Sequence, residues 1–400
     1  MINALRIANF RSIRNQELKL APITILYGHN SAGKSSFLYS LAVLKNAILN
    51  PNQQSLAFFN LGFANLGDFQ KVVFDHKEES FVTFKAESNL ADGTAVSYEV
   101  SIRGSEGKLV LNANDKFKVE LKLAVALPYP LNQQDRKDIE LDGKLFSVTW
   151  NGVTAQVTPT EQTPELLEKG QQIARALNSP VEAIRKIDFV PLGRGFSKPH
   201  YSPVAQTPLL LTEDELATYL ANNMYLQGKL STYLEGILGR EFRVHVPPGT
   251  AMFSLYTVEK RTGLTVEVIN DGFGINQIIW LLAKCLRNDA DMICIEEPEI
   301  HLHPTAVRAL VHALVTMVRR ESKSFLVSTH SEALVMALLA LVAQGELKPS
   351  ELHCYLARKE EKETLLEQQE VQEKGQIKGG LTSFMEAELK DLKVFLKAQE

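Results

Sequence analysis

The stretch of sequence that decides the fold runs from residue 28 to residue 36 and reads Gly28-His29-Asn30-Ser31-Ala32-Gly33-Lys34-Ser35-Ser36. It fits the pattern GxxxxGK[ST] and joins an apolar run at residues 18–27, typical of a strand, to a helical pattern that begins at Lys34. In that setting, backbone N–H groups at the start of the helix form a cradle for phosphate. We expect Lys34 to reach the β- and γ-phosphates of a nucleotide and the Ser35 hydroxyl to ligate Mg²⁺.

Two further segments carry the carboxylates and the histidine that phosphate chemistry needs. The apolar residues 292–295 lead to Glu296 and Glu297, and the apolar residues 325–327 lead to His330. Glu296 is expected to hold Mg²⁺, directly or through water, while Glu297 polarises an attacking water molecule. A histidine at the carboxyl end of a strand faces the ligand crevice of an α/β sheet, so we expect His330 to contact the γ-phosphate. Solvated acids and a helix-capping histidine are the alternatives, and the nearby phosphate loop makes them less favoured.

A glycine-rich turn precedes another predicted helix. The segment Asn270-Asp271-Gly272-Phe273-Gly274 comes directly before a helical pattern that starts at Ile275. The N-terminus of a helix carries uncompensated N–H groups and attracts anions. Such a turn binds one phosphate only weakly, so an ordinary strand-to-helix turn remains the alternative.

Along the chain the order is phosphate loop, glycine-rich turn, paired glutamates and strand-end histidine. In this order the motifs resemble those of the ABC-type AAA ATPases of the SMC, RecF and OLD group, in particular short prokaryotic members without a TOPRIM nuclease. By this resemblance, GHNSAGKSS is the Walker A motif, NDGFG the signature motif and ICIEEPEIHLHP the Walker B motif with its D-loop. LVSTH resembles the switch-histidine strand, and Arg11 in IANFRSIRN is implied to lie near the nucleotide. Gln70 in GDFQKVV is the candidate for the Q-loop glutamine at the metal, with a surface strand residue as the alternative.

The resemblance implies an ATPase that converts ATP and water to ADP and phosphate with Mg²⁺. It further implies a head-to-head homodimer, in which ATP lies between residues 28–36 of one copy and the signature residues of the other, namely Asn270, Asp271, Gly272 and Gly274. The sequence departs from ABC transporters at Glu296, where they have Asp, and it lacks the LSGGQ wording of the signature. The missing LSGGQ and the segment EEPEIHLHP argue against a transporter subunit, and the lack of an NKxD motif argues against a small GTPase.

Two hypotheses for the biological role follow from the resemblance. One is an ATPase switch that acts on DNA or controls a partner effector in genome maintenance or antiphage defence. The other is a nucleotide-gated binding scaffold whose ATP turnover is incidental, and steady-state hydrolysis with and without DNA separates the two. The basic residues considered for DNA contact do not form a dense patch in the sequence; they are Lys45, Lys71, Arg185, Lys186, Arg194 and Lys198.

The expected fold class is α/β: a P-loop NTPase core of the ABC type with an antiparallel β block and an inserted helical lid subdomain. Residues 69–157 form short, half-alternating runs between turn signals, which is typical of an antiparallel block. The two nucleotide-binding motifs lie far apart in the chain yet must meet on one nucleotide, so we expect a single ATPase domain over residues 1–400. Its expected parts are an N-terminal lobe (1–157), an inserted helical and loop region (158–240), a C-terminal lobe (241–360) and a terminal amphipathic helix (381–400).

Composition limits the remaining classes of protein. Hydrophobic residues make up 45% of the chain, enough for a large core, and the formal net charge of −4 excludes a strongly basic coat protein. The cysteines, Cys285, Cys294 and Cys354, are scattered, so we expect no disulfide framework and a reducing, cytoplasmic location. The longest apolar run, residues 333–343, is shorter than the ~20 residues that span a bilayer, so no membrane association is expected.

The remaining expectations concern other functional classes. His301 and His303 form an HxH pair, for which the D-loop interpretation is favoured over a metal site because no third ligand stands nearby. The stretch after Ala343 contains no DxD, so we expect no nuclease, and residues 51–259 show no sustained heptad, so we expect no coiled-coil arm. The terminal helix has an apolar stripe that packs on its own domain or docks a separate effector protein; the stripe consists of Phe384, Leu389, Leu392 and Leu396.

Overall fold

The computed structural model describes residues 1–207 and 212–378, which divide into two compact units. The first unit consists of Met1–Leu20, Ser31–Ile187 and Arg358–Leu366. The second consists of Ala21–Asn30, Asp188–Ala357 and the described residues from Glu367 onward. The amphipathic helix predicted for residues 381–400 lies outside the described part of the chain.

Antiparallel strands dominate the first unit. Its larger sheet has the strand order β2 (Ile13–Lys19), β1 (Ala4–Phe10), β4 (Val82–Asn89), β5 (Ala95–Arg103), β6 (Glu106–Ala113) and β7 (Val119–Ala126). A second sheet has the order β10 (Ala155–Pro159), β9 (Lys144–Trp150) and β8 (Asp135–Leu141). In β4 and β7 buried residues largely alternate with more accessible ones, because an antiparallel sheet packs one face on the core.

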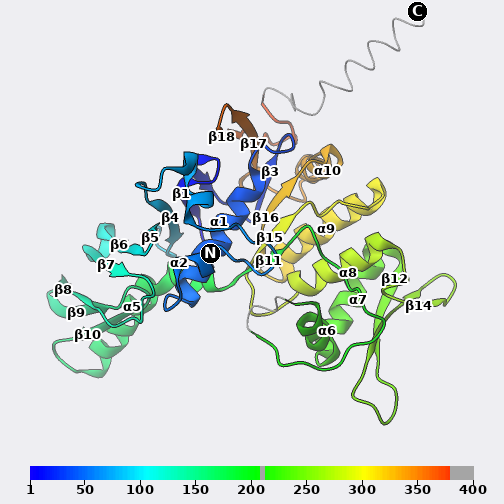
Figure 1. Cartoon of the computed structure of the whole chain (residues 1–400), viewed down its shortest axis with the longest axis horizontal. Coiled ribbons are helices and arrows are strands. Elements are labelled where there is room, and N and C mark those ends of the chain that lie inside the picture. The colour runs from blue at the N-terminus through cyan, green and yellow to red at the C-terminus, as the bar shows by residue number, and fades with distance from the viewer. Residues whose placement is uncertain (208–211, 379–400) are drawn as a thin grey trace, which may run out of the picture. The chain divides into compact units, whose positions relative to one another are not determined.

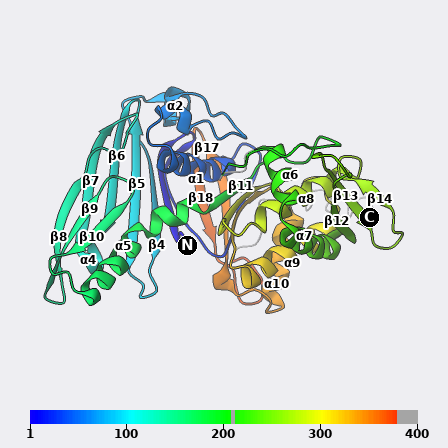
Figure 2. The same ribbon diagram turned by 90° about the horizontal axis from the view of Figure 1, so that it is seen from below.

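Helices cover parts of these sheets. They are α1 (Lys34–Leu49), α2 (Ser55–Phe58), α3 (Phe69–Val72), the 3₁₀ turn η1 (Phe74–His76), α4 (Asn114–Phe117) and α5 (Pro164–Arg185). Figure 2 shows α5 lying along the strands of this unit, where it contacts β10 and β5. The antiparallel block predicted over residues 69–157 is wrong at residues 71–76, because the carboxylate of Asp68 accepts a hydrogen bond from the Lys71 N–H and caps a short helix there.

The second unit is built on a sheet with a parallel centre. The strand order is β11 (Ile187–Val190), β15 (Met292–Glu296), β16 (Ser324–Thr329), β3 (Ile23–Tyr27), β17 (Leu352–Glu360) and β18 (Glu363–Gln369). Every residue of β15, β16 and β3 is buried. Parallel strands covered on both faces need such continuous apolar runs, which is the pattern that the sequence shows.

Helices and a small antiparallel sheet complete the second unit. The helices are α6 (Glu213–Ala221), α7 (Met224–Leu238), α8 (Phe273–Cys285), α9 (Pro304–Arg320), α10 (Glu332–Ala343) and the 3₁₀ turn η2 (Pro349–Glu351); the sheet contains β12 (Arg240–His245), β13 (Ser254–Glu259) and β14 (Thr265–Glu267). Figure 1 shows α7 beside α8 and α9, which it contacts. Thr212 and Glu215 form a capping box at the start of α6. Among the described residues, no helix combines the length and apolarity that a membrane span requires.

The predicted fold class is confirmed: the chain is α/β, with a P-loop between β3 and α1, an antiparallel block and inserted helices. The inserted helices are α5 in the first unit and α6 and α7 in the second. The predicted boundaries of the lobes stay a prediction.

The register of the parallel strands decides where the motifs lie. Glu296 pairs with Ser328 across β15 and β16, and Thr329 pairs with Tyr27 across β16 and β3. The three strands therefore end level with one another. The residues that directly follow them come to the same carboxyl edge of the sheet, where α/β proteins place their ligands.

Candidate nucleotide site

The phosphate loop connects β3 to α1 and needs glycine at both ends. Gly28 and Gly33 have φ angles of 140° and 90°. A Cβ atom at Gly28 would overlap the carbonyl oxygen of Ala357, and one at Gly33 would overlap the hydroxyl of Thr364. Residues 29–31 between them are exposed, so this part of the loop is open to a ligand. Only glycine meets both the conformational and the steric demand.

The start of α1 is suited to an anion. Lys34, its first residue, is buried, while Ser35 is half-buried and Ser36 is buried. No acidic residue lies in the first turn, and no side chain caps the helix. The positive end of the helix dipole is therefore not compensated by a local carboxylate. In the same unit, the guanidinium of Arg11 lies 5.6 Å from the ring centre of Tyr39 on α1, so Arg11 is held beside this helix.

A row of hydrogen bonds joins the three strand ends of the second unit. The ring Nδ1 of His330 lies 2.9 Å from the carbonyl oxygen of Gly28, and its Nε2 lies 2.9 Å from Oε1 of Glu297. The backbone N–H of His330 donates to Oε2 of the same glutamate at 3.0 Å. The His330 ring therefore lies between the phosphate loop and the predicted catalytic glutamate, within hydrogen-bonding distance of both.

The backbone of Glu297 is unusual. It has a φ angle of 42°, in the left-handed region that non-glycine residues rarely adopt, and its N–H donates to the carbonyl of Ser328 at 2.9 Å. Glu296, the preceding residue, ends β15 and is buried. Such conformations persist where the surroundings hold them, and they are concentrated at functional sites.

Sequence reasoning missed a residue of this site, Arg194. Its side chain is buried, and its Nη1 donates to the carbonyl oxygens of Glu296 at 2.7 Å and Pro191 at 3.0 Å. Its Nη2 donates to the carbonyl oxygen of Glu297 at 2.8 Å. Burial lowers the pKa of Arg194 to about 10, against the opposing effect of the Glu299 and Glu296 carboxylates, so the group is charged at neutral pH.

The sequence contained one signal for this role. Arg194 is a cation between two glycines in PLGRGF, within a segment rich in Gly and Pro that had to adopt a defined shape. It was considered only among the scattered cations for DNA contact. The structure uses two of those cations internally, because Lys45 is also buried and donates to the carbonyl oxygen of Ile187. Lys198 is paired with Asp214 at 2.7 Å.

The signature segment is exposed except at Asp271 and, in part, Gly274. Gly272 and Phe273 are exposed at the start of α8, whose first turn has no acidic residue. Asp271 is buried instead, and its carboxylate accepts from the Thr257 hydroxyl and lies 3.5 Å from Arg240. The Asn270 side chain, one residue earlier, donates to Glu267 at 2.8 Å.

The D-loop approaches the signature helix closely. A Cβ atom at Gly274 would lie 2.6 Å from the carbonyl oxygen of His301, so glycine is needed there. The His301 ring packs edge-on against Phe273 with 4.8 Å between ring centres, and His303 caps α9 by accepting from the Thr305 N–H. His301 and His303, the HxH pair, thus pack against Phe273 and cap α9, respectively.

Gln70 lies in the first unit and is exposed on α3, a helix rather than the predicted strand. Its carbonyl oxygen lies 2.8 Å from Nδ1 of His76, so its backbone holds the η1 turn. Its role at a metal stays a prediction.

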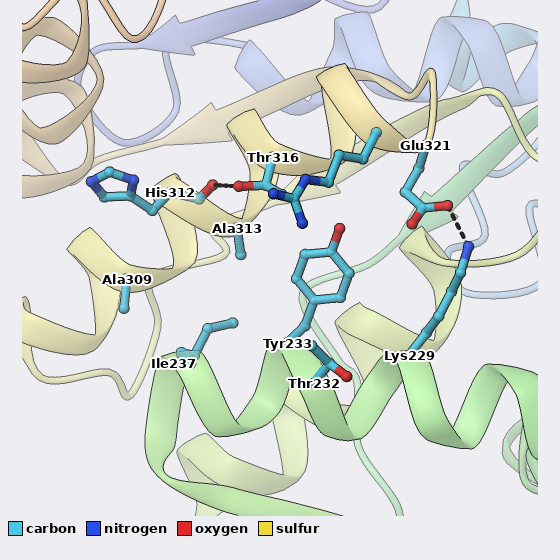
Figure 3. Close-up of a pocket in the computed structure, with 11 residues that line it drawn as sticks. Lys229, Thr232, Tyr233, Ile237, Ala309, His312, Ala313, Thr316 and Glu321 are labelled. Atoms are coloured by element: carbon cyan, nitrogen blue, oxygen red, sulfur yellow. Dashed lines mark hydrogen bonds and ion pairs between the residues drawn. The ribbon is translucent and has the colours of Figure 1, made fainter.

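A separate cavity of about 510 Å³ lies between α7 and α9 (Figure 3). Tyr233 and Ile237 line it from α7, and Ala309 and Ala313 from α9. Lys229 and Glu321 form an ion pair of 2.5 Å at its rim. None of the predicted site residues lines this cavity.

Two family models match the chain in sequence. Residues 1–152 match the model described as "AAA ATPase domain", and residues 150–337 match the model described as "AAA domain, putative AbiEii toxin, Type IV TA system". Between them the two models span both halves of the predicted nucleotide site. No curated protein sequence matches the chain.

Solved SMC head domains are similar in structure. One is the SMC head bound to the C-terminal winged-helix domain of ScpA, with 10% identity, a TM-score of 0.50 and coverage of 92% of this chain and 97% of that one. The SMC head of Thermotoga maritima (9% identity, TM-score 0.46, coverage 92% and 98%) and that of Pyrococcus furiosus bound to ScpA (10%, 0.47, 100% and 99%) are less similar by TM-score. At such identity the likeness shows the fold. That fold is a P-loop NTPase of the ABC type, and each of the two family models matches an AAA ATPase domain over less than half of the chain.

Proposed function

We propose that this protein binds ATP with Mg²⁺ and hydrolyses it to ADP and phosphate. The observation that carries the proposal is the row of bonds from Gly28 through His330 to Glu297, which brings the phosphate loop and the catalytic carboxylate to one sheet edge. In the proposed reaction, Glu297 accepts a proton from the attacking water. His330 orients this carboxylate and responds to the γ-phosphate, so both residues are proposed as catalytic.

The phosphates bind the backbone of residues 28–36 in this proposal, with Lys34 neutralising the β- and γ-phosphates and Arg11 close to the nucleotide. Ser35, Glu296 and Gln70 are proposed to hold Mg²⁺. A hydroxyl, a carboxylate and an amide all supply oxygen ligands, which are the donors that Mg²⁺ prefers. When bound, the ion would neutralise charge that develops on the phosphate oxygens.

We further propose that ATP joins two copies head to head. The open N-terminus of α8, with exposed Gly272 and no acid in its first turn, supports contact with a phosphate of the partner copy. Asn270, Asp271 and Gly274 belong to this proposed contact, with Asp271 contributing its backbone because its carboxylate is engaged by Arg240. The two units would then work as a single ATPase domain, and hydrolysis would release the dimer.

The proposed role is a switch that acts on DNA or controls a separate effector protein in genome maintenance or antiphage defence. One comparison supports a protein partner, an SMC head solved in complex with ScpA. A nucleotide-gated scaffold with incidental turnover is the second candidate. It is favoured by the Glu297 carboxylate, both of whose oxygens already accept bonds from His330.

The test combines turnover with oligomeric state. ATP hydrolysis is measured with and without double-stranded DNA, and the Glu297→Gln variant is passed over a sizing column with and without ATP. The proposal expects turnover by the wild-type protein and an ATP-dependent dimer of the variant. A variant that elutes as a monomer in ATP would remove the dimer model, and ATP-dependent dimers without turnover would favour the scaffold.

A further inference from the structure

A loop in the second unit connects the signature helix α8 to the Walker B glutamates. It consists of residues 191–196 and follows β11. Arg194 reaches the glutamate backbone from this loop, and Asn276 of α8 holds the loop from the other side. We infer that Arg194 and Asn276 form a rigid link, through which the position of the α8 N-terminus sets the backbone of Glu297. The inference rests on the proposed function and deepens it by naming a regulation of the same site.

Asn276 clamps the loop with both ends of its amide. The side chain is 5% exposed and lies one turn after the start of α8. Its Nδ2 donates to the carbonyl oxygen of Phe196 at 2.8 Å, and its Oδ1 accepts from the Phe196 N–H at 2.7 Å. A Cβ atom at Gly195, where φ is 132°, would lie only 3.2 Å from that Oδ1. The close approach fixes the loop to the helix at a defined distance.

The Phe196 side chain makes the attachment stiff. Its ring lies 5.1 Å from that of Trp280, one turn further along α8, and 6.1 Å from that of Tyr201. All three side chains are buried. Packed aromatic contacts resist small displacements, so the loop is expected to move with α8 as one body.

The Arg194 guanidinium connects this loop to the backbone of Glu296 and Glu297 at the carboxyl edge of the sheet. Its bonds to the carbonyl oxygens of Glu296 and Glu297 hold the peptide that gives Glu297 its φ of 42°. The direction of the Glu297 side chain toward His330 depends on that backbone conformation. Arg194 touches no proposed substrate, so it is a positioning residue, and the link is a contiguous chain of bonds between two functional elements.

The coupling has a consequence for the proposed dimer. When a partner's nucleotide engages the N-terminus of α8, the link would bring Glu297 of the same chain into its working position. Binding at one site would thereby promote hydrolysis at the other, and the rate of turnover would rise cooperatively with ATP concentration.

The test uses two neighbouring buried amides on α8. Asn276→Leu removes the clamp at similar volume, and Gln277→Leu is the matched control, since among the described residues the Gln277 side-chain oxygen has no hydrogen-bond partner. We expect Asn276→Leu to lower kcat about 5- to 30-fold, with unchanged ATP affinity and a Hill coefficient near one. Arg194→Gln should lower kcat by about 10²-fold, and Arg194→Lys, which keeps the charge, should recover part of it. Combining Asn276→Leu with Arg194→Gln should add little to Arg194→Gln alone.

A second measurement does not depend on turnover. Backbone hydrogen exchange in residues 292–299 should be faster in Asn276→Leu than in Gln277→Leu, because the clamp no longer holds the glutamate peptide. Equal exchange in both variants, or wild-type kcat and cooperativity in folded Asn276→Leu, would overturn the link while leaving an ATPase in place. If the wild-type protein turned over no ATP, the proposed function would fall, and the exchange comparison would still decide whether the link exists.

Discussion

Two clusters of charged residues lie in the second unit, and they differ in access. The edge cluster consists of Glu297, His330 and Arg194, at the carboxyl ends of the parallel strands. The buried cluster consists of Asp188, Lys284 and Arg287, where one carboxylate oxygen lies 3.0 Å from Lys284 Nζ and the other 2.8 Å from Arg287 Nη1. The side chains of the buried cluster are 4–7% exposed, whereas that of His330 is 40% exposed.

The difference shows that buried charge by itself does not mark a functional site. In the buried cluster, burial lowers the pKa of Lys284 while Asp188 opposes the shift, and the ion pairs are shielded from any ligand. The edge cluster combines charge with an accessible histidine and a backbone in the left-handed region at Glu297. A site for chemistry differs from a structural ion pair in two features: a ligand can reach its side chains, and its backbone is held in a rare conformation. Substitutions in the edge cluster should therefore change activity, and those in the buried cluster should change stability.

The largest expected effect is on activity in the edge cluster. Glu297→Gln keeps the shape of the side chain but removes the proton acceptor, so kcat should fall by about 10²–10⁴-fold. The free energy of unfolding should change little, because the partner His330 is half exposed. Steady-state ATP hydrolysis and urea unfolding of the same preparation measure the two quantities. Glu182→Gln on the surface of α5 is the control, and a large loss of stability in Glu297→Gln would contradict the comparison.

The buried cluster should respond in the opposite way. Asp188→Asn removes the buried carboxylate that both Lys284 and Arg287 contact, while Arg287 keeps its ion pair with Asp289, so the free energy of unfolding should fall by about 3–5 kcal/mol. Lys284 binds its proton less tightly in the folded chain than in the unfolded chain, where its pKa is 10.5. The unfolded chain therefore holds more protons just below pH 10.5, and the variant should regain stability as pH rises toward that value.

Urea unfolding of Asp188→Asn at pH 7 and near pH 10 measures both effects. The rate of ATP hydrolysis per folded molecule at pH 7 should match that of the wild-type protein. Loss of activity in a fully folded Asp188→Asn sample would show that the two clusters are not independent.

His330→Ala should have an intermediate effect on activity. It removes the ring contacts to the Glu297 carboxylate and to the Gly28 carbonyl oxygen. Because these contacts orient the carboxylate that accepts the proton, kcat should fall by about 10–10²-fold with little change in ATP affinity. His312→Ala, in the cavity between α7 and α9, is the matched control and should retain wild-type kinetics. Equal kinetics in both variants would remove His330 from the catalytic set.

The smallest effect concerns thiol reactivity around the buried cluster. Cys285, beside Lys284, and Cys354 are buried, and burial raises the pKa of both thiols, that of Cys354 to about 12. Their thiolate fraction at pH 8 is therefore small, and a disulfide reagent should not modify either residue in the native protein. Absorbance at 412 nm follows the released thiolate, and all cysteines should react once urea unfolds the chain. Rapid labelling of Cys285 in the native protein would show that the buried cluster opens to solvent.

The fold was largely predictable because its signals are local. The phosphate loop is recognised by the fixed spacing of its residues. Continuous apolar runs predict the parallel strands, which are buried on both faces of the sheet. The error at residues 71–76 has a local cause as well, since an Asp68 cap outweighed the apolar pattern. The pairing of Glu297 with His330 was not predicted, because the sequence does not give the register of β15 and β16.

The sequence by itself determined the fold class, the order of the motifs and the residue types that phosphate chemistry requires. Tertiary structure alone decided that Arg194 holds the glutamate backbone, that Asp271 turns inward to Arg240, and that Asn276 ties α8 to the same loop. The physical reason is distance along the chain. Spacing and periodicity report what neighbours in sequence do, whereas these three contacts join residues brought together only when the strands and helices pack.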